Sequence, residues 1–244
     1  MALPEHLAQE LVVGLYDRGA ELPSKQRILD IGTSKILKSK IWSPYLVNLR
    51  PALSLDSQSQ MPRERQKRVK GLLLESVGTE LDLLTEEDGV TFDHIFGPPE
   101  AGTPLASAVS GVSGHSLLWK RVIPKGDYGS HEDLEGVYFD GQDVVEVDDV
   151  VTKADTKREA AEFLASCGLN AVGVVIAFDR EQGGSKAIED MGMKVRAALR
   201  AKAAFAYLLD AGRLTQAQHD FLVDYTVNPA PLEEPADHPW KNIQ

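Results

Sequence analysis

The sequence predicts an α/β fold in which a central parallel sheet is covered by helices on both faces. In the middle of the 244-residue chain, apolar runs of strand length alternate with segments whose apolar residues recur at helical spacing. Strands that are joined through helices form right-handed crossovers, which make the strands parallel. The hydrophobic content of 43% is close to that of an average globular protein and predicts a sizeable core.

The N-terminal part contains two predicted helices and one short strand. Residues 4–19 carry apolar residues at helical spacing after a proline, as the start of a helix does. Within the mixed pattern of 35–53, only 45–49 is typical of a strand. Residues 63–84 return to helical spacing, with a basic first half.

The central stretch supplies the sheet. Strands are predicted at 92–96, 117–122, 144–147 and 171–178, helices at 105–112 and 156–167, and loops at 97–104 and 126–135. The second loop is polar and punctuated by glycines, so we expect it to be mobile. From Asn228 onward the chain lacks periodicity, which predicts an irregular tail.

Charge and cysteine content restrict the class of protein. The formal net charge of −11 argues against a general binder of nucleic acid or of anionic membranes. The single cysteine, Cys167, rules out a disulfide within the chain and favours a reducing, cytoplasmic location. Neither a leader peptide nor an apolar run of membrane-spanning length is expected.

Two adjacent acids follow the strand predicted at 144–147. In an open parallel sheet, ligands bind outside the carboxyl ends of the strands. Asp148 and Asp149 would stand at such an end, where carboxylates accept hydrogen bonds from vicinal hydroxyls and hold a hydrated Mg²⁺ nearby. The helix that starts at Thr156 would offer backbone N–H groups to a phosphate. An acidic turn that only caps this helix explains the same residues equally well.

Five collinear segments resemble the type I phosphoribosyltransferases. Residues 144–156 resemble their phosphoribosyl pyrophosphate signature, an apolar run followed by two acids, two apolar residues and Thr152. The segment Phe178-Asp179-Arg180-Glu181-Gln182-Gly183-Gly184 resembles one peculiar to the orotate phosphoribosyltransferases, including the domain fused in uridine monophosphate synthases. The remaining segments, 36–50, 92–106 and 120–136, are similar to the family's hood, pyrophosphate loop and catalytic loop.

This resemblance implies the type I phosphoribosyltransferase fold, a central parallel sheet flanked by helices with a small hood subdomain. The phosphoribosyltransferase domain would span residues 1–228, with a core at 60–200 and a hood formed mainly by 20–50 plus C-terminal contributions. Residues 229–244 would form the irregular tail. The family also implies a homodimer in which the loop 120–135 reaches the neighbouring site, and we expect association with another enzyme of pyrimidine synthesis.

The resemblance further implies a reaction, in which orotate and phosphoribosyl pyrophosphate give orotidine 5′-monophosphate and pyrophosphate with Mg²⁺. The transition state would resemble a ribosyl cation, so catalysis would consist mostly of positioning and electrostatics. Orotate would be bound by Lys38 and Arg180. Phosphoribosyl pyrophosphate would contact Lys120, Arg121, Lys125, Tyr128, Asp148, Asp149, Thr152, Lys153, Ala154, Asp155 and Thr156. The catalytic residues would be Lys125, Arg121, Asp148 and Asp149, and the two acids would hold the metal through water or substrate.

The phosphate loop departs from the family pattern of a small residue, glycine and Ser or Thr. Here Lys153-Ala154-Asp155 stands in its place, so an alanine replaces a glycine and a carboxylate lies where a phosphate should bind. Lys40, Ala101, Val122 and an extra Gly126 are further departures. They keep open an alternative, a catalytically weak or inactive homologue that acts as a nucleotide-binding or interaction protein. A phosphoribosyltransferase for a different base is disfavoured by the Arg180 segment.

Overall fold

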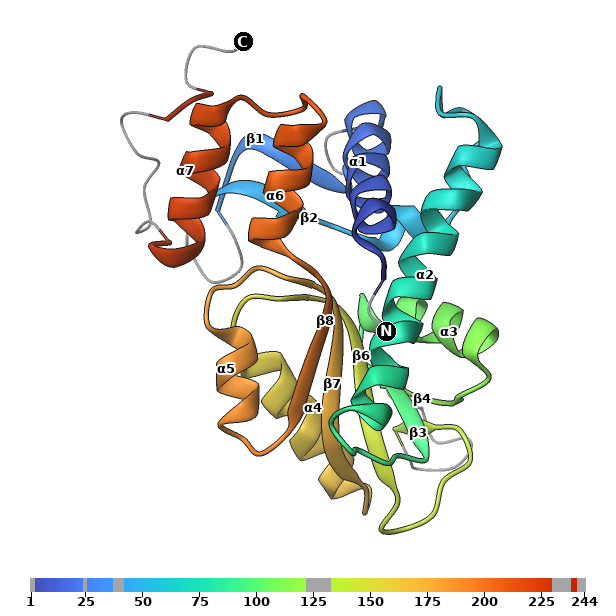
Figure 1. Cartoon of the computed structure of the whole chain (residues 1–244). Coiled ribbons are helices and arrows are strands. Elements are labelled where there is room, and N and C mark those ends of the chain that lie inside the picture. The colour runs from blue at the N-terminus through green and yellow to red at the C-terminus, as the bar shows by residue number, and fades with distance from the viewer. Residues whose placement is uncertain (1–2, 24–25, 37–41, 122–132, 230–237, 241–244) are drawn as a thin grey trace.

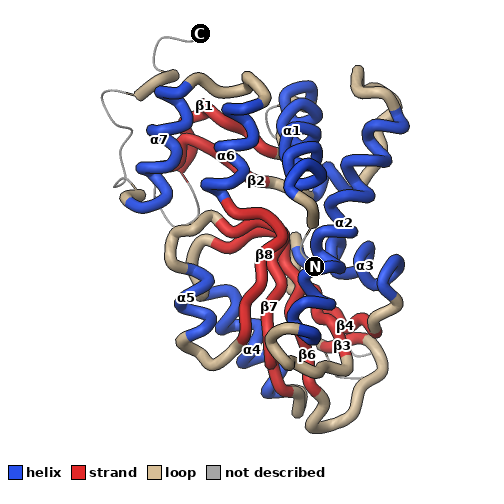
Figure 2. Tube along the Cα trace, in the orientation of Figure 1, coloured by secondary structure: helices blue, strands red, loops and turns tan. Residues whose placement is uncertain are grey.

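The structure is a computed structural model that describes residues 3–23, 26–36, 42–121, 133–229 and 238–240. It consists of a six-stranded sheet flanked by helices and, beyond one end of the strands, a two-stranded hairpin surrounded by further helices (Figures 1 and 2). None of the helices in the described part of the chain is long and apolar enough to cross a membrane.

The large sheet has the strand order β5-β4-β3-β6-β7-β8. Its strands are β3 (His94–Gly97), β4 (Ser116–Lys120), β5 (Leu134–Glu135), β6 (Asp143–Val151), β7 (Asn170–Asp179) and β8 (Lys194–Arg200). All neighbours in it are parallel except β5, which pairs antiparallel with β4. The predicted α/β class with a central, mostly parallel sheet is therefore confirmed.

Helices cover both faces of this sheet. The helices packed on it are α2 (Arg63–Glu86), α3 (Gly102–Ser113), α4 (Asp155–Ser166) and α5 (Gly184–Glu189). Successive residues of a strand point to opposite faces, and the two faces belong to different cores. Val145 joins the large core with α2 and α3, whereas Val144 joins a smaller core with Leu164 of α4.

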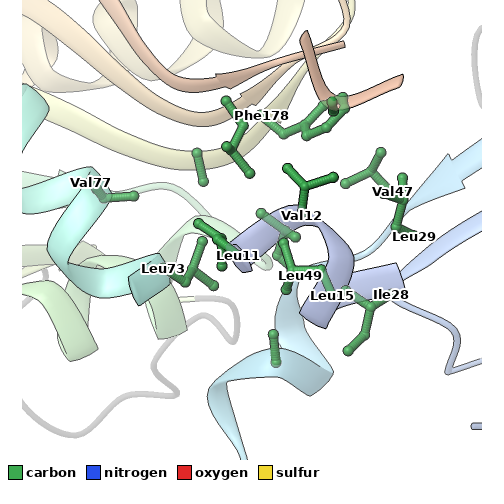
Figure 3. Close-up of a cluster of buried hydrophobic side chains, with 14 of the residues drawn as sticks. Leu11, Val12, Leu15, Ile28, Leu29, Val47, Leu49, Leu73, Val77 and Phe178 are labelled. Carbon is green, nitrogen blue, oxygen red and sulfur yellow. The ribbon is translucent and has the colours of Figure 1, made fainter. Parts of the chain in front are cut away.

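The second part of the molecule is built around the antiparallel hairpin of β1 (Leu29–Ile36) and β2 (Trp42–Val47), which we call the hood hairpin. Around it lie α1 (Glu5–Glu21), the 3₁₀ turn η1 (Arg50–Leu53), α6 (Ala201–Asp210) and α7 (Gln216–Val227). The apolar face of α1 fills the space between the hairpin and the sheet, with Val12 lying between Val47 and Phe178 (Figure 3). One continuous core therefore ties the hairpin to β7.

The sequence analysis predicts none of α5, β8, α6 and α7, and it predicts the hood hairpin only in part. Only 45–49 is predicted as a strand there, whereas β1 is missed and β2 ends at Val47. The register of the hairpin shifts between Ile31 and Lys35, opposite Pro44. Proline lacks an N–H, so an irregular partner strand fits it better than a regular ladder does. This irregularity obscures the alternation from which strands are recognised.

Other elements differ from their predicted bounds. β6 continues to Val151, because its pairing with β7 runs on to Asp179, so Asp148 and Asp149 lie within the end of the strand rather than after it. α3 begins three residues early, at Gly102. The predicted loop 126–135 ends in the short strand β5; residues 126–132 lie outside the described part.

Candidate functional site

The two motifs of interest meet at the carboxyl ends of β6 and β7. Val151 pairs with Asp179, and the Arg180 N–H donates to the carbonyl of Val151 at 3.2 Å. Gly184 follows at close range, because a Cβ added there would come within 2.9 Å of the carbonyl oxygen of Thr152. Only glycine permits this approach, and the contact holds the loop after β6 against the loop after β7.

Asp148 is engaged in a buried charge cluster. Glu146 and Asp148 are two residues apart on β6 and point to the same side, where Lys157 of α4 lies between them. Lys157 is fully buried; its Nζ lies 2.7 Å from Glu146 Oε1 and contacts Asp148 Oδ2. Asp148 Oδ1 accepts a hydrogen bond from the Asp149 N–H at 2.8 Å. Both oxygens of Asp148 therefore have partners in the protein.

Burial and the neighbouring charges shift the pKa values of Glu146 and Lys157 in this cluster. Burial raises the pKa of Glu146 to about 7, against the attraction of Lys157. Although Nζ is close, Oε1 has no well-directed hydrogen bond within the described chain. Burial would lower the pKa of Lys157, but Glu146 and Asp148 outweigh this effect and raise it. At neutral pH the lysine is charged and lies between the two carboxyl groups.

Lys157 and Glu146 are site residues that the sequence analysis missed. A signal was present, since Lys157, Ala160 and Leu164 share the buried face of α4 at helical spacing. Glu146 likewise interrupts an otherwise apolar strand core. A lysine and a glutamate on two buried faces that pack together indicate an internal ion pair.

Asp149 points to the other side of β6 and is less buried than Asp148. Burial and the neighbouring Asp148 carboxylate raise the pKa of Asp149 to about 7, while Lys157, the Val150 N–H and, last, Arg50 act against this shift. Arg50 is exposed at the start of η1, and its Nε donates to Asn48 Oδ1 at 3.2 Å. Arg50 is absent from the predicted set of site residues.

The loop after β6 tolerates its unusual residues. Ala154 has φ −90° and ψ 6°, a conformation that an alanine adopts without strain in place of the family's glycine. Its methyl group is buried in the small core that contains Val151 and Ile188. The Asp155 side chain is 74% exposed, with Oδ1 3.9 Å from Arg158 Nη1.

The start of α4 is available to an anion. Among the described residues no side chain caps this helix, so its first N–H groups keep their hydrogen-bonding capacity. Thr152 is half-buried beside this helix start, and Lys153 and Thr156 are exposed. The predicted phosphate-binding residues 152–156 therefore lie together.

Replacing Ala154 with glycine is expected to destabilise the protein by about 1 kcal/mol without raising activity. The alanine conformation is unstrained and its methyl group is buried. Urea unfolding measures the change, and Ala165→Gly, at an exposed position of the same helix, controls for backbone entropy alone. A clear gain of activity in Ala154→Gly would contradict this interpretation.

The residues on either side of 122–132 have partners of their own. Lys120 Nζ lies 4.0 Å from the ring centroid of Phe163 on α4. The Arg121 side chain forms an ion pair with Glu135 of β5, and the Arg121 backbone N–H donates to the Asp133 carbonyl at 2.8 Å. Within the described residues, neither cation contacts the acidic pair. Lys38, Lys125 and Tyr128, with Lys40, Val122 and Gly126, lie outside the described residues.

Arg180 is buried at the junction of the sheet and the hood hairpin. Its guanidinium carbon lies 4.0 Å from the ring centroid of Tyr45, and Nη2 donates to Ser43 Oγ at 2.8 Å. Nε donates to Gln182 Oε1 at 3.2 Å. Gln182 Nε2 is buried without a hydrogen-bond partner among the described residues. Among the described residues, the hydrogen-bond partners of this buried guanidinium are neutral oxygens. Its charge is therefore suited to bidentate binding of a planar anion.

The loop between β3 and α3 completes the surroundings of Asp148. A Cβ added to Gly102 would come within 2.8 Å of Asp148 Oδ1, so this loop lies against the acidic pair. Thr103 Oγ1 donates to the Gly97 carbonyl at 2.8 Å and fixes the turn into α3, whose N-cap is Ala101. The described residues contain no group of three or more acidic, His or Cys side chains able to hold a metal directly.

The known proteins that this chain resembles in sequence or in fold include orotate phosphoribosyltransferases and uridine monophosphate synthases. The chain is 30% identical over 195 residues to a uridine 5′-monophosphate synthase of Bos taurus, covering 80% of this chain and 35% of that protein. It is 27% identical over 203 residues to an orotate phosphoribosyltransferase of Sulfurisphaera tokodaii, covering 83% of this chain and 94% of the relative. A solved UMP synthase of Leishmania donovani matches with a TM-score of 0.68 and 24% identity, covering 91% of this chain and 42% of that one.

No family model matches the chain. It spans 35% of the bovine synthase, and 60% and 57% of two archaeal orotate phosphoribosyltransferases, from Pyrococcus furiosus and Thermococcus gammatolerans.

The parallel sheet, the acidic pair at the end of β6 and the loops that meet there define a type I phosphoribosyltransferase fold. The relatives that resemble this chain in sequence are orotate phosphoribosyltransferases and uridine monophosphate synthases.

Proposed function

We propose that this protein is an orotate phosphoribosyltransferase that transfers the 5-phosphoribosyl group from phosphoribosyl pyrophosphate to orotate in the synthesis of pyrimidine nucleotides. The observation that carries the proposal is the buried Arg180 guanidinium, held by Ser43, Tyr45 and Gln182 without a carboxylate among the described residues. Orotate is planar and carries a carboxylate, and a bidentate guanidinium matches both properties. Lys38 would approach the same ligand.

The ribose and phosphate side would use the ends of β6 and α4. Asp149, the more accessible acid, would accept hydrogen bonds from the ribose hydroxyls, while Asp148 supports it from the Lys157 cluster. The N–H groups at the start of α4, with Thr152, Lys153, Ala154, Asp155 and Thr156, would surround the 5′-phosphate. Lys120, Arg121, Lys125 and Tyr128 would gather the pyrophosphate as the loop closes.

The carboxylate oxygens of Asp148 and Asp149 fit Mg²⁺ as hard ligands. Because the described residues form no three-ligand site, the two acids would hold the ion through water or substrate. The ion would neutralise charge on the leaving pyrophosphate. The protein's own part is to orient ribose and base and to exclude water.

The assembly and location follow from the same proposal. We propose a homodimer in which the loop 120–135 of each subunit reaches the site of its partner. A cytoplasmic location and association with another enzyme of pyrimidine synthesis accompany this function. Sedimentation and affinity purification measure the two associations separately.

A direct assay tests the function. Purified protein with Mg²⁺, phosphoribosyl pyrophosphate and orotate should consume orotate absorbance, and orotidine 5′-monophosphate with pyrophosphate should restore it. Chelation of the metal should stop both directions. Absence of turnover in both directions, with phosphoribosyl pyrophosphate still bound in calorimetry, would instead support the alternative of a nucleotide-binding homologue. Absence of both turnover and binding would overturn the enzyme assignment.

A further inference from the structure

The described end of the chain, His238–Trp240, lies on the hood hairpin, although the sequence predicts an irregular tail there. Trp240 forms an edge-to-face contact with Phe221 of α7, with ring centroids 5.8 Å apart. The His238 ring lies 6.0 Å from Trp42 and 6.4 Å from Phe221. Residues His238 and Trp240 thus lie at the hood end of the molecule, against β1 and α7. We call His238–Trp240 the C-terminal clasp.

The clasp contacts both strands of the hairpin. On β1, the Trp240 indole packs against Gly32, where an added Cβ would come within 2.5 Å of Cδ1. Gly32 has φ +85°, a conformation that glycine adopts readily and other residues do not. On β2, His238 meets Trp42, which is almost fully buried. The clasp therefore bridges the two strands on either side of the segment that carries Lys38.

A chain of aromatic contacts leads from the clasp to Arg180. Phe221 packs against Trp42 at 6.2 Å, and Trp42 packs against Tyr225 at 5.9 Å. The Tyr225 hydroxyl donates to the Trp42 carbonyl at 2.7 Å, and its ring lies 6.0 Å from Tyr45. Tyr45 in turn supports the Arg180 guanidinium. Edge-to-face pairs in a buried cluster have definite geometry, so loss of one end loosens the next.

We propose that the C-terminal clasp is a positioning element of the orotate side of the site, acting through the hood hairpin on Ser43 and Tyr45 and so on Arg180. The inference rests on the proposed function for its kinetic consequence. It assigns no role to the clasp on the phosphate side, where β6 and α4 are held by the Lys157 cluster and by Gly184. The effect of weakening the clasp should accordingly differ between the two substrates.

The kinetic test uses Trp240→Ala in the full chain. The KM for orotate is expected to rise about tenfold, because a small misplacement of a positioning group is enough for such a loss. The KM for phosphoribosyl pyrophosphate should stay within about twofold under the same reasoning. Phe139→Ala removes an exposed aromatic side chain from the segment before β6 and serves as the matched control. It should change neither KM value. An equal rise of both KM values in Trp240→Ala would overturn the proposal.

A second test does not depend on activity. Hydrogen exchange should accelerate at the amides of β1 and β2 in Trp240→Ala and remain unchanged in β6 and β7. Gly32→Ala should do the same from the other side of the contact, because its methyl group displaces the indole. If wild-type protein shows no turnover while these amides respond, the proposed function fails and the clasp remains. Unchanged exchange in the hairpin of both variants would overturn the clasp itself.

Discussion

Replacing Lys157 with methionine is expected to destabilise the fold by about 3–5 kcal/mol. Methionine fills a similar volume, but it leaves Glu146 and Asp148 buried without their cation. An uncompensated buried charge costs more than any lost contact of the lysine stem. Chemical denaturation at neutral pH measures the effect.

A paired substitution provides the control for this expectation. In Glu146→Leu with Lys157→Met, Asp148 is the one carboxyl group of the cluster left without its cation, so part of the lost stability should return. Single and double variants form a cycle whose coupling energy reports the interaction itself. If Lys157→Met unfolds at the same denaturant concentration as the wild type, the buried cluster does not contribute as the structure indicates.

Replacing Arg180 with lysine is expected to lower kcat/KM for orotate by about 100-fold or more, because a point charge cannot replace a bidentate, stacked guanidinium. The lysine would lose the two hydrogen bonds to Ser43 and Gln182 and much of the stacking on Tyr45. The KM for phosphoribosyl pyrophosphate should change little. Steady-state kinetics with each substrate varied in turn give both numbers.

Arg196→Lys is the matched control for Arg180→Lys. Arg196 lies on β8 of the same sheet and binds the carboxylates of Glu80, Glu87 and Asp88. Its replacement should affect stability and leave the orotate KM unchanged. Similar kinetic losses in both variants would mean that Arg180 acts through the fold rather than on the base.

The sequence predicts an element well where its hydrophobic periodicity ends at the same residues as its helix or its strand pairing. The long helix α2 and the strand β7 have clean periodicity and nearly their predicted bounds. β6 was predicted to end at Val147 because two acids follow, yet its pairing with β7 carries the strand through them. Partner strands decide such cases, and a partner is not visible in local sequence.

The candidate site shows the same division. The acidic pair and Arg180 stand out because motif and strand position coincide, and the structure brings them to neighbouring strand ends. The sequence does not reveal the role of Lys157, because its partners lie on a strand that packs against its helix. The sequence does not reveal the role of Trp240 either, because aromatic residues in an aperiodic tail carry no indication of what they pack against.

The buried Glu146–Lys157 pair has a consequence for how this sequence can diverge. A change of Lys157 alone leaves two buried carboxyl groups without their cation, whereas a change of Glu146 alone leaves Lys157 paired with Asp148, so we expect Glu146 to change first or together with Lys157. The two positions should therefore covary among descendants of this chain while the neighbouring core positions drift independently. A glutamate before the acidic pair together with a lysine in the following helix would then serve as a lineage marker within the family.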